Sequence, residues 1–167
     1  FLDEVSNLSW GTQGKLLRVL ETRRVKRVGD SKDRPVDIRL IAATNKDLAE
    51  QVRKGDFRED LLYRLDVVPV RLPPLRERRG DVPLLAGAFL DQFRRRNPDT
   101  ALRRIGPEAM EALESWSWPG NVRELKNTIE RVAILCDEAR LEPRHLPSRL
   151  TRGGPATSRP LPERWDD

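Results

Sequence analysis

The sequence predicts an α/β fold class, in which part of a parallel-sheet core is followed by an α-helical subdomain. Two short apolar segments near the start, Phe1-Leu2 and residues 40–43, each run directly into polar residues. Polar groups that follow strands in this way mark the ligand-binding edge of parallel α/β sheets. From residue 80 onward, apolar residues recur at the spacing of amphipathic helices. We therefore expect an α/β part that carries a site and a separate helical part.

The composition describes a heavily charged chain with one cysteine. Basic residues outnumber acidic ones by 32 to 27, which gives a net charge of +5. This excess permits contact with nucleic acid without requiring it. Cys136 is the only cysteine, which excludes an intrachain disulfide and fits a reducing compartment. We assign no metal or catalytic role to the only histidine, His145. No apolar run reaches the roughly eighteen residues of a membrane span, so we expect no membrane partner.

The opening residues predict the end of a buried strand. A strand usually has about five residues, and only Phe1-Leu2 precede the carboxylates here. We therefore expect the chain to be part of a longer polypeptide that supplies the first half of the sheet. In such a position Asp3 can hold Mg²⁺ through water, and Glu4 can orient or deprotonate an attacking water. Two apolar residues before two carboxylates are a common pattern, so this motif alone identifies nothing.

A helix is expected at residues 9–21, with Leu16, Leu17 and Leu20 on its inner side. Its segment 11–15 resembles a phosphate-binding loop. That motif needs four residues between its glycines and a Ser or Thr after its lysine. The sequence has two residues between the glycines and Leu16 after the lysine, so we exclude a nucleotide-binding loop at this point.

Two strands are expected at residues 24–28 and 36–43. The second strand ends in a continuous apolar run, which is typical of a buried strand. Thr44-Asn45 follow it, where the Asn45 amide can touch both a terminal phosphate and the attacking water. The alternative is that Asn45 caps a helix starting at Lys46. The sequence leaves both interpretations open.

A short helix is predicted within residues 55–65, which carry two arginines six positions apart. A helix turns about 100° per residue, so Arg58 and Arg64 are offset by roughly 240° and cannot share one face. With Arg58 at the helix start and Arg64 near its end, both could reach one phosphate group of a neighbouring molecule, because guanidinium groups suit phosphate oxygens. The alternative is an amphipathic surface helix with solvated charges.

A proline-rich segment separates the two parts. Residues 67–72 predict a short strand that Pro69 makes edge-like, and Pro73-Pro74 then prevent the chain from continuing as a helix. We assign the α/β part to residues 1–72, a connector to 73–79, the helical subdomain to 80–150 and an unstructured tail to 151–167.

The helical subdomain is expected to hold helices at residues 81–96, 107–116 and 121–136. In the third helix, Asn121 is expected to act as the cap together with Glu124, and Cys136 is expected to be a small core residue. Arg123 lies in the first turn, where the helix dipole disfavours a cation. That placement suggests an anionic partner nearby.

Six segments together form a longer pattern. They are FLDE at residues 1–4, QGKLLRVL at 13–20, IAATN at 41–45, FREDLLYRL at 57–65, LPPLRER at 72–78 and WPGNVRELKN at 118–127. In this order they resemble the sigma-54-dependent transcription activators, which are AAA+ ATPases also called bacterial enhancer-binding proteins. The resemblance runs from residue 1 to about residue 150. It implies part of an AAA+ P-loop-type core followed by a helical lid subdomain.

The resemblance implies roles for the polar residues of the α/β part. Asp3 and Glu4 resemble the Walker B pair, which serves Mg²⁺ and the hydrolytic water. Thr44 and Asn45 resemble the sensor I segment, with Thr44 counted among the nucleotide-binding residues.

The resemblance also implies roles for four arginines. Arg58 and Arg64 resemble the arginine fingers that enter the nucleotide site of a neighbouring subunit. Arg123 resembles the sensor II arginine of the lid, which contacts the nucleotide. Arg76 lies in the matching connector and is expected to be a further nucleotide contact.

The family works as a ring, usually a hexamer, that uses ATP and Mg²⁺ to remodel the closed complex of sigma-54 RNA polymerase. The resemblance therefore implies further copies of the protein, sigma-54 RNA polymerase and, through a separate C-terminal domain, DNA as partners. It also implies a bacterial cytoplasmic location.

Three parts of the family pattern are absent from these 167 residues: the phosphate loop, the loop that grips sigma-54 and the C-terminal helix-turn-helix. Without the amides and lysine of a phosphate loop, little holds the β- and γ-phosphates, so we expect no ATPase activity from the chain alone. Two functions stay open: the second half of the motor of a transcription regulator, or a naturally truncated, non-catalytic chain that modulates a full-length ring. A stand-alone DNA-binding module is a more distant third.

Overall fold

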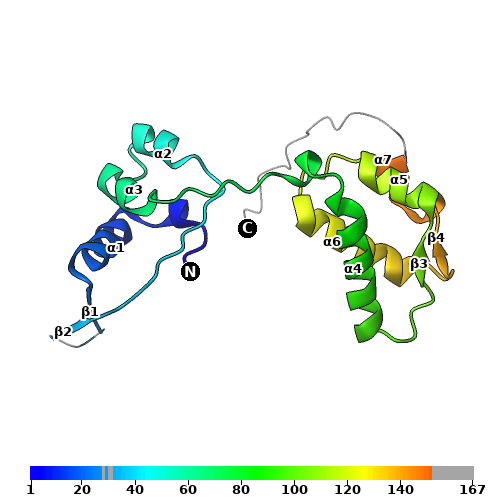
Figure 1. The fold of residues 1–167 in the computed structure, drawn as a ribbon, viewed down its shortest axis with the longest axis horizontal. Coiled ribbons are helices and arrows are strands. Elements are labelled where there is room, and N and C mark those ends of the chain that lie inside the picture. The colour runs from blue at the N-terminus through cyan, green and yellow to red at the C-terminus, as the bar shows by residue number, and fades with distance from the viewer. Residues whose placement is uncertain (28, 30–31, 152–167) are drawn as a thin grey trace, which may run out of the picture. The chain divides into compact units, whose positions relative to one another are not determined.

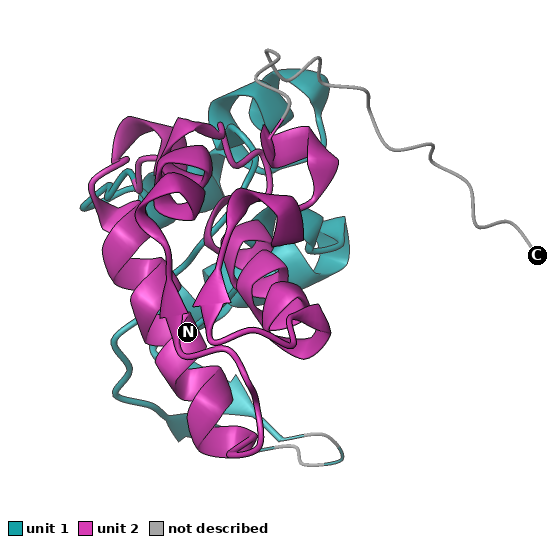
Figure 2. Ribbon diagram, turned by 90° about the vertical axis from the view of Figure 1, so that its right-hand side faces the viewer, with its two compact units in different colours: residues 1–71 teal, residues 72–167 magenta. Residues whose placement is uncertain are grey.

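The computed structural model describes residues 1–27, 29 and 32–151. The chain divides into two compact units, Phe1–Arg71 and Leu72–Asp167, which are coloured separately in Figure 2. Each unit has its own helices and its own short strand pair (Figure 1). The tail expected at residues 151–167 lies outside the described residues, except for Thr151.

The first unit combines helices with a small antiparallel ribbon. Its elements are η1 (Val5–Asn7), α1 (Trp10–Thr22), β1 (Arg24–Lys26), β2 (Asp33–Pro35), α2 (Leu48–Lys54) and α3 (Glu59–Leu65). The helix expected at residues 9–21 is confirmed as α1, and Ser9 caps it by accepting the Thr12 N–H at 3.3 Å. Side chains of Val5, Phe57 and Leu61 are fully buried in this unit.

Two segments far apart in the sequence lie side by side and parallel in this unit. The Leu2 N–H donates to the Ile41 carbonyl at 2.8 Å, and the Ala43 N–H donates back to the Leu2 carbonyl at 2.8 Å. The Val5 N–H then donates to the Ala43 carbonyl at 3.0 Å. This pairing is the piece of parallel sheet that the sequence predicted.

The strands are shorter than the sequence predicted. β1 and β2 pair antiparallel from Arg24↔Pro35 to Lys26↔Asp33. The strand expected at residues 24–28 is therefore shorter than predicted. The strand expected at residues 36–43 is wrong, because β2 ends at Pro35 and only Ala42 of that segment forms a bridge. Residues 36–41 form no helix or strand, and Ile41 is 54% exposed. A buried strand needs neighbours on both sides and cover on both faces. Among the described residues, the only bridge to this run is Leu2↔Ala42.

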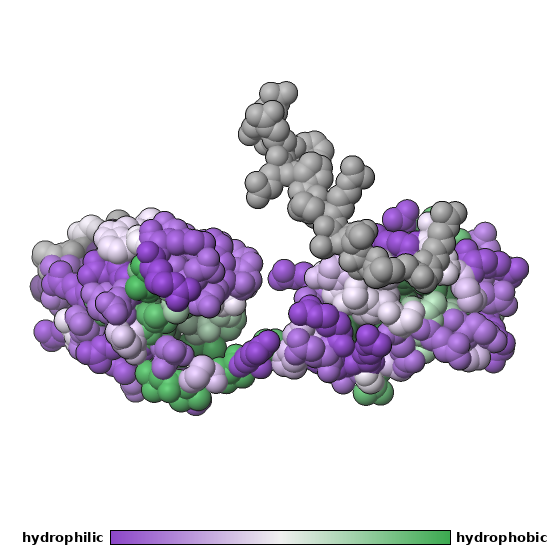
Figure 3. Space-filling model, turned by 90° about the horizontal axis from the view of Figure 1, so that it is seen from above, coloured by the Kyte–Doolittle hydropathy of each residue, from purple (hydrophilic) through white to green (hydrophobic). Residues whose placement is uncertain are grey.

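The strand expected at residues 67–72 is also wrong. This segment forms no helix or strand. Four of its apolar side chains are between 75% and 83% exposed, namely those of Val67, Val68, Val70 and Leu72. Apolar surface gathers on the body that carries residues 1–71 (green in Figure 3). No second strand pairs with the segment among the described residues, and Pro69 has no N–H to donate.

The second unit is mainly helical. Its elements are η2 (Leu75–Glu77), α4 (Asp81–Arg96), β3 (Arg104–Ile105), α5 (Pro107–Ser115), α6 (Asn121–Leu135), β4 (Arg140–Leu141), η3 (Pro143–His145) and α7 (Ser148–Thr151). The helix expected at residues 81–96 is confirmed at both ends, and the other two expected helices end one residue earlier than predicted. No helix in the described part of the chain is long and apolar enough to cross a membrane.

A parallel strand pair was not expected in this unit. β3 and β4 pair through Arg104↔Arg140 and Ile105↔Leu141, so the prediction that the subdomain is helical throughout is wrong in this detail. Gly106 permits the close approach, because a Cβ there would lie 2.7 Å from the Leu141 carbonyl oxygen.

One core runs through the second unit. It joins α4, α5 and α6 with the short elements that follow, and its largest member, Trp118, is 1% exposed and donates its indole N–H to the Leu113 carbonyl at 2.8 Å. Cys136 is 4% exposed, which confirms its predicted place in the core. The described part of this unit therefore buries its own apolar face.

Candidate functional site

The parallel pairing brings two predicted polar pairs to one edge of the first unit. Asp3-Glu4 follow the first paired segment and Thr44-Asn45 follow the second, and all four side chains are exposed. Carboxylate and amide groups at the carboxyl ends of neighbouring parallel segments are placed to meet a ligand. These four residues, predicted from separate motifs, thus form one edge.

Glu4 has a strained backbone at this edge. Its φ of 51° and ψ of 47° lie in the left-handed region, which costs a residue with a side chain about 1–2 kcal/mol. Such strain concentrates at functional positions. Glu4 Oε2 accepts the Asn7 amide N–H at 2.9 Å, and Asn7 Oδ1 accepts from Lys46 Nζ at 3.1 Å. This chain of contacts ties the two ends of the edge together through two residues that the sequence analysis missed.

The alternative role for Asn45 as a helix cap is wrong. The following helix, α2, begins at Leu48, and Asp47 caps it by accepting the Glu50 N–H at 3.1 Å. Thr44 Oγ1 accepts the Lys46 N–H at 3.0 Å and so turns the chain between the strand-like segment and the helix. The Asn45 amide is left exposed at the polar edge.

Arg58 stands at the N-cap of α3 with its guanidinium fixed by two neighbours. Nε and Nη2 donate to the two carboxylate oxygens of Asp60 at 3.0 and 2.7 Å. Its Cζ lies 5.5 Å from the centre of the Trp10 ring, within the range of a cation–π contact. The hydrogen bond to Asp60 raises the pKa of Arg58, and the same contact lowers the pKa of the Asp60 carboxyl.

Arg64 is placed differently on the same helix. It lies in the last turn of α3, and its side chain is exposed. Within the described part of the chain it forms no ion pair. A guanidinium in this position is free to meet an anion from another molecule.

Gln13 is a buried polar residue that the sequence analysis missed. Its exposure is 0%, its Nε2 donates to the carbonyls of Leu8 and Asp56 at 2.9 and 3.0 Å, and its Oε1 accepts the Arg58 N–H at 2.9 Å. The available signal was a polar side chain on the helix face that also carries Leu16, Leu17 and Leu20.

In the second unit, one hydrogen bond joins the segments that carry Arg76 and Arg123. The Leu75 N–H donates to Asn121 Oδ1 at 2.8 Å, and the side chains of Arg76, next to Leu75, and Arg123, in the first turn of α6, are both exposed. The predicted cap role of Asn121 is wrong, because its side chain accepts the Leu75 N–H of the connector. Gly120 is the N-cap of α6, and the Glu124 carboxylate accepts the Gly120 N–H at 2.9 Å.

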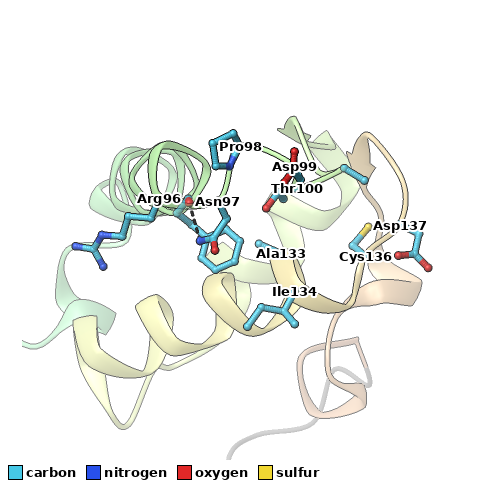
Figure 4. Close-up of a pocket in the computed structure, with 11 residues that line it drawn as sticks. Arg96, Asn97, Pro98, Asp99, Thr100, Ala133, Ile134, Cys136 and Asp137 are labelled. Carbon is cyan, nitrogen blue, oxygen red and sulfur yellow. Dashed lines mark hydrogen bonds between the residues drawn. The ribbon is translucent and has the colours of Figure 1, made fainter.

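A depression of the second unit is lined by neither Arg76 nor Arg123. It measures ≈480 Å³ and lies between the end of α4, residues 97–101 and the end of α6 (Figure 4). Its walls include Thr100, Cys136 and Asp137, and none of the predicted site residues lines it.

The segment 11–15, which resembles a phosphate loop, lies within α1. Its helical conformation agrees with its exclusion as a nucleotide-binding loop.

Each unit carries exposed groups of a type that binds a charged ligand. In the first unit, Asp3 offers the kind of carboxylate oxygen that Mg²⁺ prefers. In the second unit, Arg76 and Arg123 carry guanidinium groups, which suit phosphate oxygens. No three His, Cys, Asp or Glu side chains gather into a metal-binding group in the described residues. Asp3 would therefore hold Mg²⁺ as a single carboxylate, with water completing the coordination.

Two family descriptions match the chain in sequence. Residues 1–71 match "Sigma-54 interaction domain" and residues 76–162 match "AAA+ ATPase lid domain". The chain belongs to the sigma-54-dependent AAA+ transcription activators. Its fold is accordingly part of an AAA+ core followed by a helical lid.

Curated relatives of this chain include a nitrogen fixation protein and a transcriptional regulatory protein. The nitrogen fixation protein AnfA of Azotobacter vinelandii is 51% identical over 150 residues, which are 90% of this chain and 28% of AnfA. The transcriptional regulatory protein ZraR of Escherichia coli K12 is 48% identical over 147 residues, which are 88% of this chain and 33% of ZraR. The chain thus spans well under half the length of either relative.

Solved structures agree with the AAA+ assignment. NtrX from Brucella abortus in complex with ADP superposes with a TM-score of 0.81 at 41% identity, over 89% of this chain and 35% of the NtrX chain. The NtrX complex with ATP gives a TM-score of 0.80 at 41% identity, over 89% of this chain and 36% of NtrX.

Proposed function

We propose that this chain is the second part of the ATP-hydrolysing motor of a sigma-54-dependent transcription regulator. The observation that carries the proposal is the parallel pairing of Leu2 with residues 41–43, which puts Asp3-Glu4 beside Thr44-Asn45. In this role Asp3 holds Mg²⁺ through water, and Mg²⁺ neutralises charge on the phosphates when it is bound. Thr44 and Asn45 contact the terminal phosphate.

Glu4 is the residue that accepts a proton from the attacking water. One carboxylate oxygen, Oε2, is already occupied by the Asn7 amide N–H. The other oxygen is left to accept from water, and the contact with Asn7 orients it. The Asn45 amide lies on the same edge and can donate to the phosphate while it accepts from the same water.

Arg58 and Arg64 act on the nucleotide of a neighbouring copy. Charge that develops on the transferred phosphoryl group is stabilised by guanidinium groups placed in advance. The exposed Arg64 without an ion pair among the described residues, and the unused N–H groups of Arg58, both support this role.

Arg76 and Arg123 are the nucleotide contacts that the lid supplies, distinct from the two arginines that act on a neighbouring copy. The Leu75–Asn121 hydrogen bond supports a coupled movement of the two arginines, because it fixes the connector to the start of α6. A lid that holds both cations can report whether a terminal phosphate is present.

The complete protein would work in the bacterial cytoplasm as a ring of identical subunits, with the hexamer that is usual in the family. It would use ATP and Mg²⁺ to remodel sigma-54 RNA polymerase and would bind DNA through a separate C-terminal domain. The match to the sigma-54 interaction domain and the NtrX complexes with ADP and ATP support the polymerase and nucleotide parts of this proposal.

Mixing of subunits tests the proposal in the complete protein. Arg58→Ala and Arg64→Ala should each abolish hydrolysis while nucleotide binding is retained, and mixing either variant with Glu4→Gln should restore activity, because each chain supplies what the other lacks. Lys54→Ala, which removes an exposed lysine paired with Glu50, is the matched control and should hydrolyse ATP normally. A failure of mixed rings to recover any activity would refute action between subunits.

The 167-residue chain by itself should release no phosphate from ATP. Phosphate release that Glu4→Gln abolishes in this same chain would contradict that expectation.

A further inference from the structure

We propose that the start of α1 is a platform that positions Arg58, with Gln13 fixing its backbone and Trp10 fixing its guanidinium. The proposal rests on the role of Arg58 as an arginine finger. It assigns a positioning role to two residues on a different element from the finger itself.

Gln13 holds the segment that leads into α3 at two places. Its amide N–H groups bind the carbonyls of Leu8 and Asp56, and its carbonyl oxygen binds the Arg58 N–H, all between 2.9 and 3.0 Å. Two carbonyl partners and one N–H partner define which end of the amide is oxygen. Gln13 is 0% exposed, so water cannot replace these hydrogen bonds without opening the packing around the side chain. The backbone position of Arg58 is therefore set from α1.

The guanidinium of Arg58 is fixed at one edge and one face. Asp60 takes Nε and one N–H of Nη2, and the Trp10 ring lies 5.5 Å away. A guanidinium has five N–H donors, so the two on Nη1 and one on Nη2 stay free for an anion. Nη1 passes 3.9 Å from the point where a Cβ on Gly14 would lie, so α1 borders this end of the group without a side chain in the way.

These contacts order the side chain before it meets a phosphate. A long side chain that is already held loses less freedom on binding, and a small displacement of a catalytic group lowers the rate strongly. The opposite effect would be that the same contacts restrain Arg58 and keep it from its target. The two effects have opposite signs in an activity assay, because a positioning contact raises turnover and a restraining contact lowers it.

Trp10→Ala in the complete protein is the decisive variant. Trp10 is 53% exposed, so its removal should leave the fold intact. We expect kcat for ATP hydrolysis to fall about 3- to 10-fold, the effect of losing a cation–π contact, while KM and ATP binding stay unchanged. Trp10→Phe keeps an aromatic face and should recover most of the rate. Thr22→Ala, an exposed change at the far end of α1, should hydrolyse ATP normally.

Gln13→Met is the companion variant, because it keeps the side-chain volume and removes all three hydrogen bonds. We expect the same loss of kcat at unchanged ATP binding. Mixing Trp10→Ala chains with an excess of Glu4→Gln chains should raise the activity per Trp10→Ala chain above that of Trp10→Ala alone, because the well-positioned Arg58 of the Glu4→Gln chain then serves the intact carboxylates of the Trp10→Ala chain. A general structural defect in the Trp10→Ala chain would not be rescued in this way.

The outcomes separate this proposal from the proposed function. If Arg58→Ala abolishes hydrolysis but Trp10→Ala has normal or raised turnover, or a loss that mixing does not rescue, the positioning role is overturned and the finger role stands. If Arg58→Ala itself hydrolyses ATP normally, the proposed function fails and the positioning role fails with it.

Discussion

Replacement of Asn121 should separate two contributions to the stability of the lid. Asn121 Oδ1 accepts the Leu75 N–H at 2.8 Å, and Leu75 is fully buried. Asn121 also has a φ of 51°, a left-handed conformation that Asn and Asp tolerate better than other residues with a side chain. A substitution can therefore remove the hydrogen bond, introduce strain or do both.

Three variants of Asn121 give three expected magnitudes. Asn121→Asp keeps an acceptor and tolerates the conformation, so the free energy of unfolding should change by less than about 0.5 kcal/mol. Asn121→Gly leaves the Leu75 N–H unsatisfied and should cost about 1–3 kcal/mol. Asn121→Ala adds the left-handed strain to that loss and should cost about 1 kcal/mol more than Asn121→Gly.

Urea unfolding followed by tryptophan fluorescence measures this order, because Trp116 and Trp118 lie in the same unit, just before α6. Hydrogen exchange at the Leu75 amide supplies a local readout, since it should stay slow with Asp at position 121 and become fast with Gly or Ala. Asn127→Ala, an exposed change within α6, is the control and should be neutral or slightly stabilising. Equal stability of the Asp and Gly variants would show that the hydrogen bond contributes nothing, and an Ala variant as stable as the Gly variant would refute the strain.

Two further predictions concern packing and charge. The added Cβ of Gly87→Ala in α4 meets no atom within 4 Å, so this change should raise the free energy of unfolding by about 0.5–1 kcal/mol. Gly106→Ala places a Cβ 2.7 Å from the Leu141 carbonyl oxygen and should lower the free energy of unfolding by about 1–3 kcal/mol. Thermal unfolding compares the two variants, and equal shifts of their midpoints would contradict the close approach. The Asp60 carboxyl should titrate by NMR below its ordinary pKa of 3.8, because Arg58 stabilises the carboxylate, and Arg58→Ala should raise that pKa toward the ordinary value. Since the folded-state pKa of Asp60 is lowered, the contribution of this pair to stability is present above pH 3.8 and is lost as the pH falls through the folded-state pKa. An unchanged Asp60 pKa in Arg58→Ala would show that the pair is not formed in solution.

Helices could be read from the sequence because their signals are local. α4 was predicted at both ends from its apolar spacing. The helix expected at residues 9–21 was predicted to within one residue at each end, because Ser9 is the N-cap of α1. Strands could not be read as well, because a strand exists only with its partners. The segment 36–43, which ends in the apolar run 40–43, looked like a buried strand, yet only a single bridge to Leu2 pairs it among the described residues. The β3–β4 pair, two residues in each strand, is too short to leave a periodic pattern.

The polar edge of the first unit was predictable for the same reason. Asp3-Glu4 and Thr44-Asn45 each follow an apolar run, so each pair carries its own local signal. The supporting contacts were missed because they join distant positions. Gln13 meets Arg58 across 45 residues, and Asn121 meets Leu75 across 46. Neither pairing leaves a mark in the spacing of one segment, although a polar residue on the apolar face of α1 was a partial clue.

Arg58 and Arg64 are not an equivalent pair, although one short helix carries both. The offset of about 240° assumes that both residues follow the helix, but Arg58 is the N-cap and has an extended φ of −77° and ψ of 130°. Its direction is therefore set by Gln13, Asp60 and Trp10. Ordering a free arginine side chain costs about 2 kcal/mol in conformational entropy. The contacts of Arg58 restrict its side chain before any partner binds, whereas the exposed Arg64 must still be ordered on binding. In a site formed by two copies, we therefore expect Arg58 to fix the geometry of the contact and Arg64 to adapt to it.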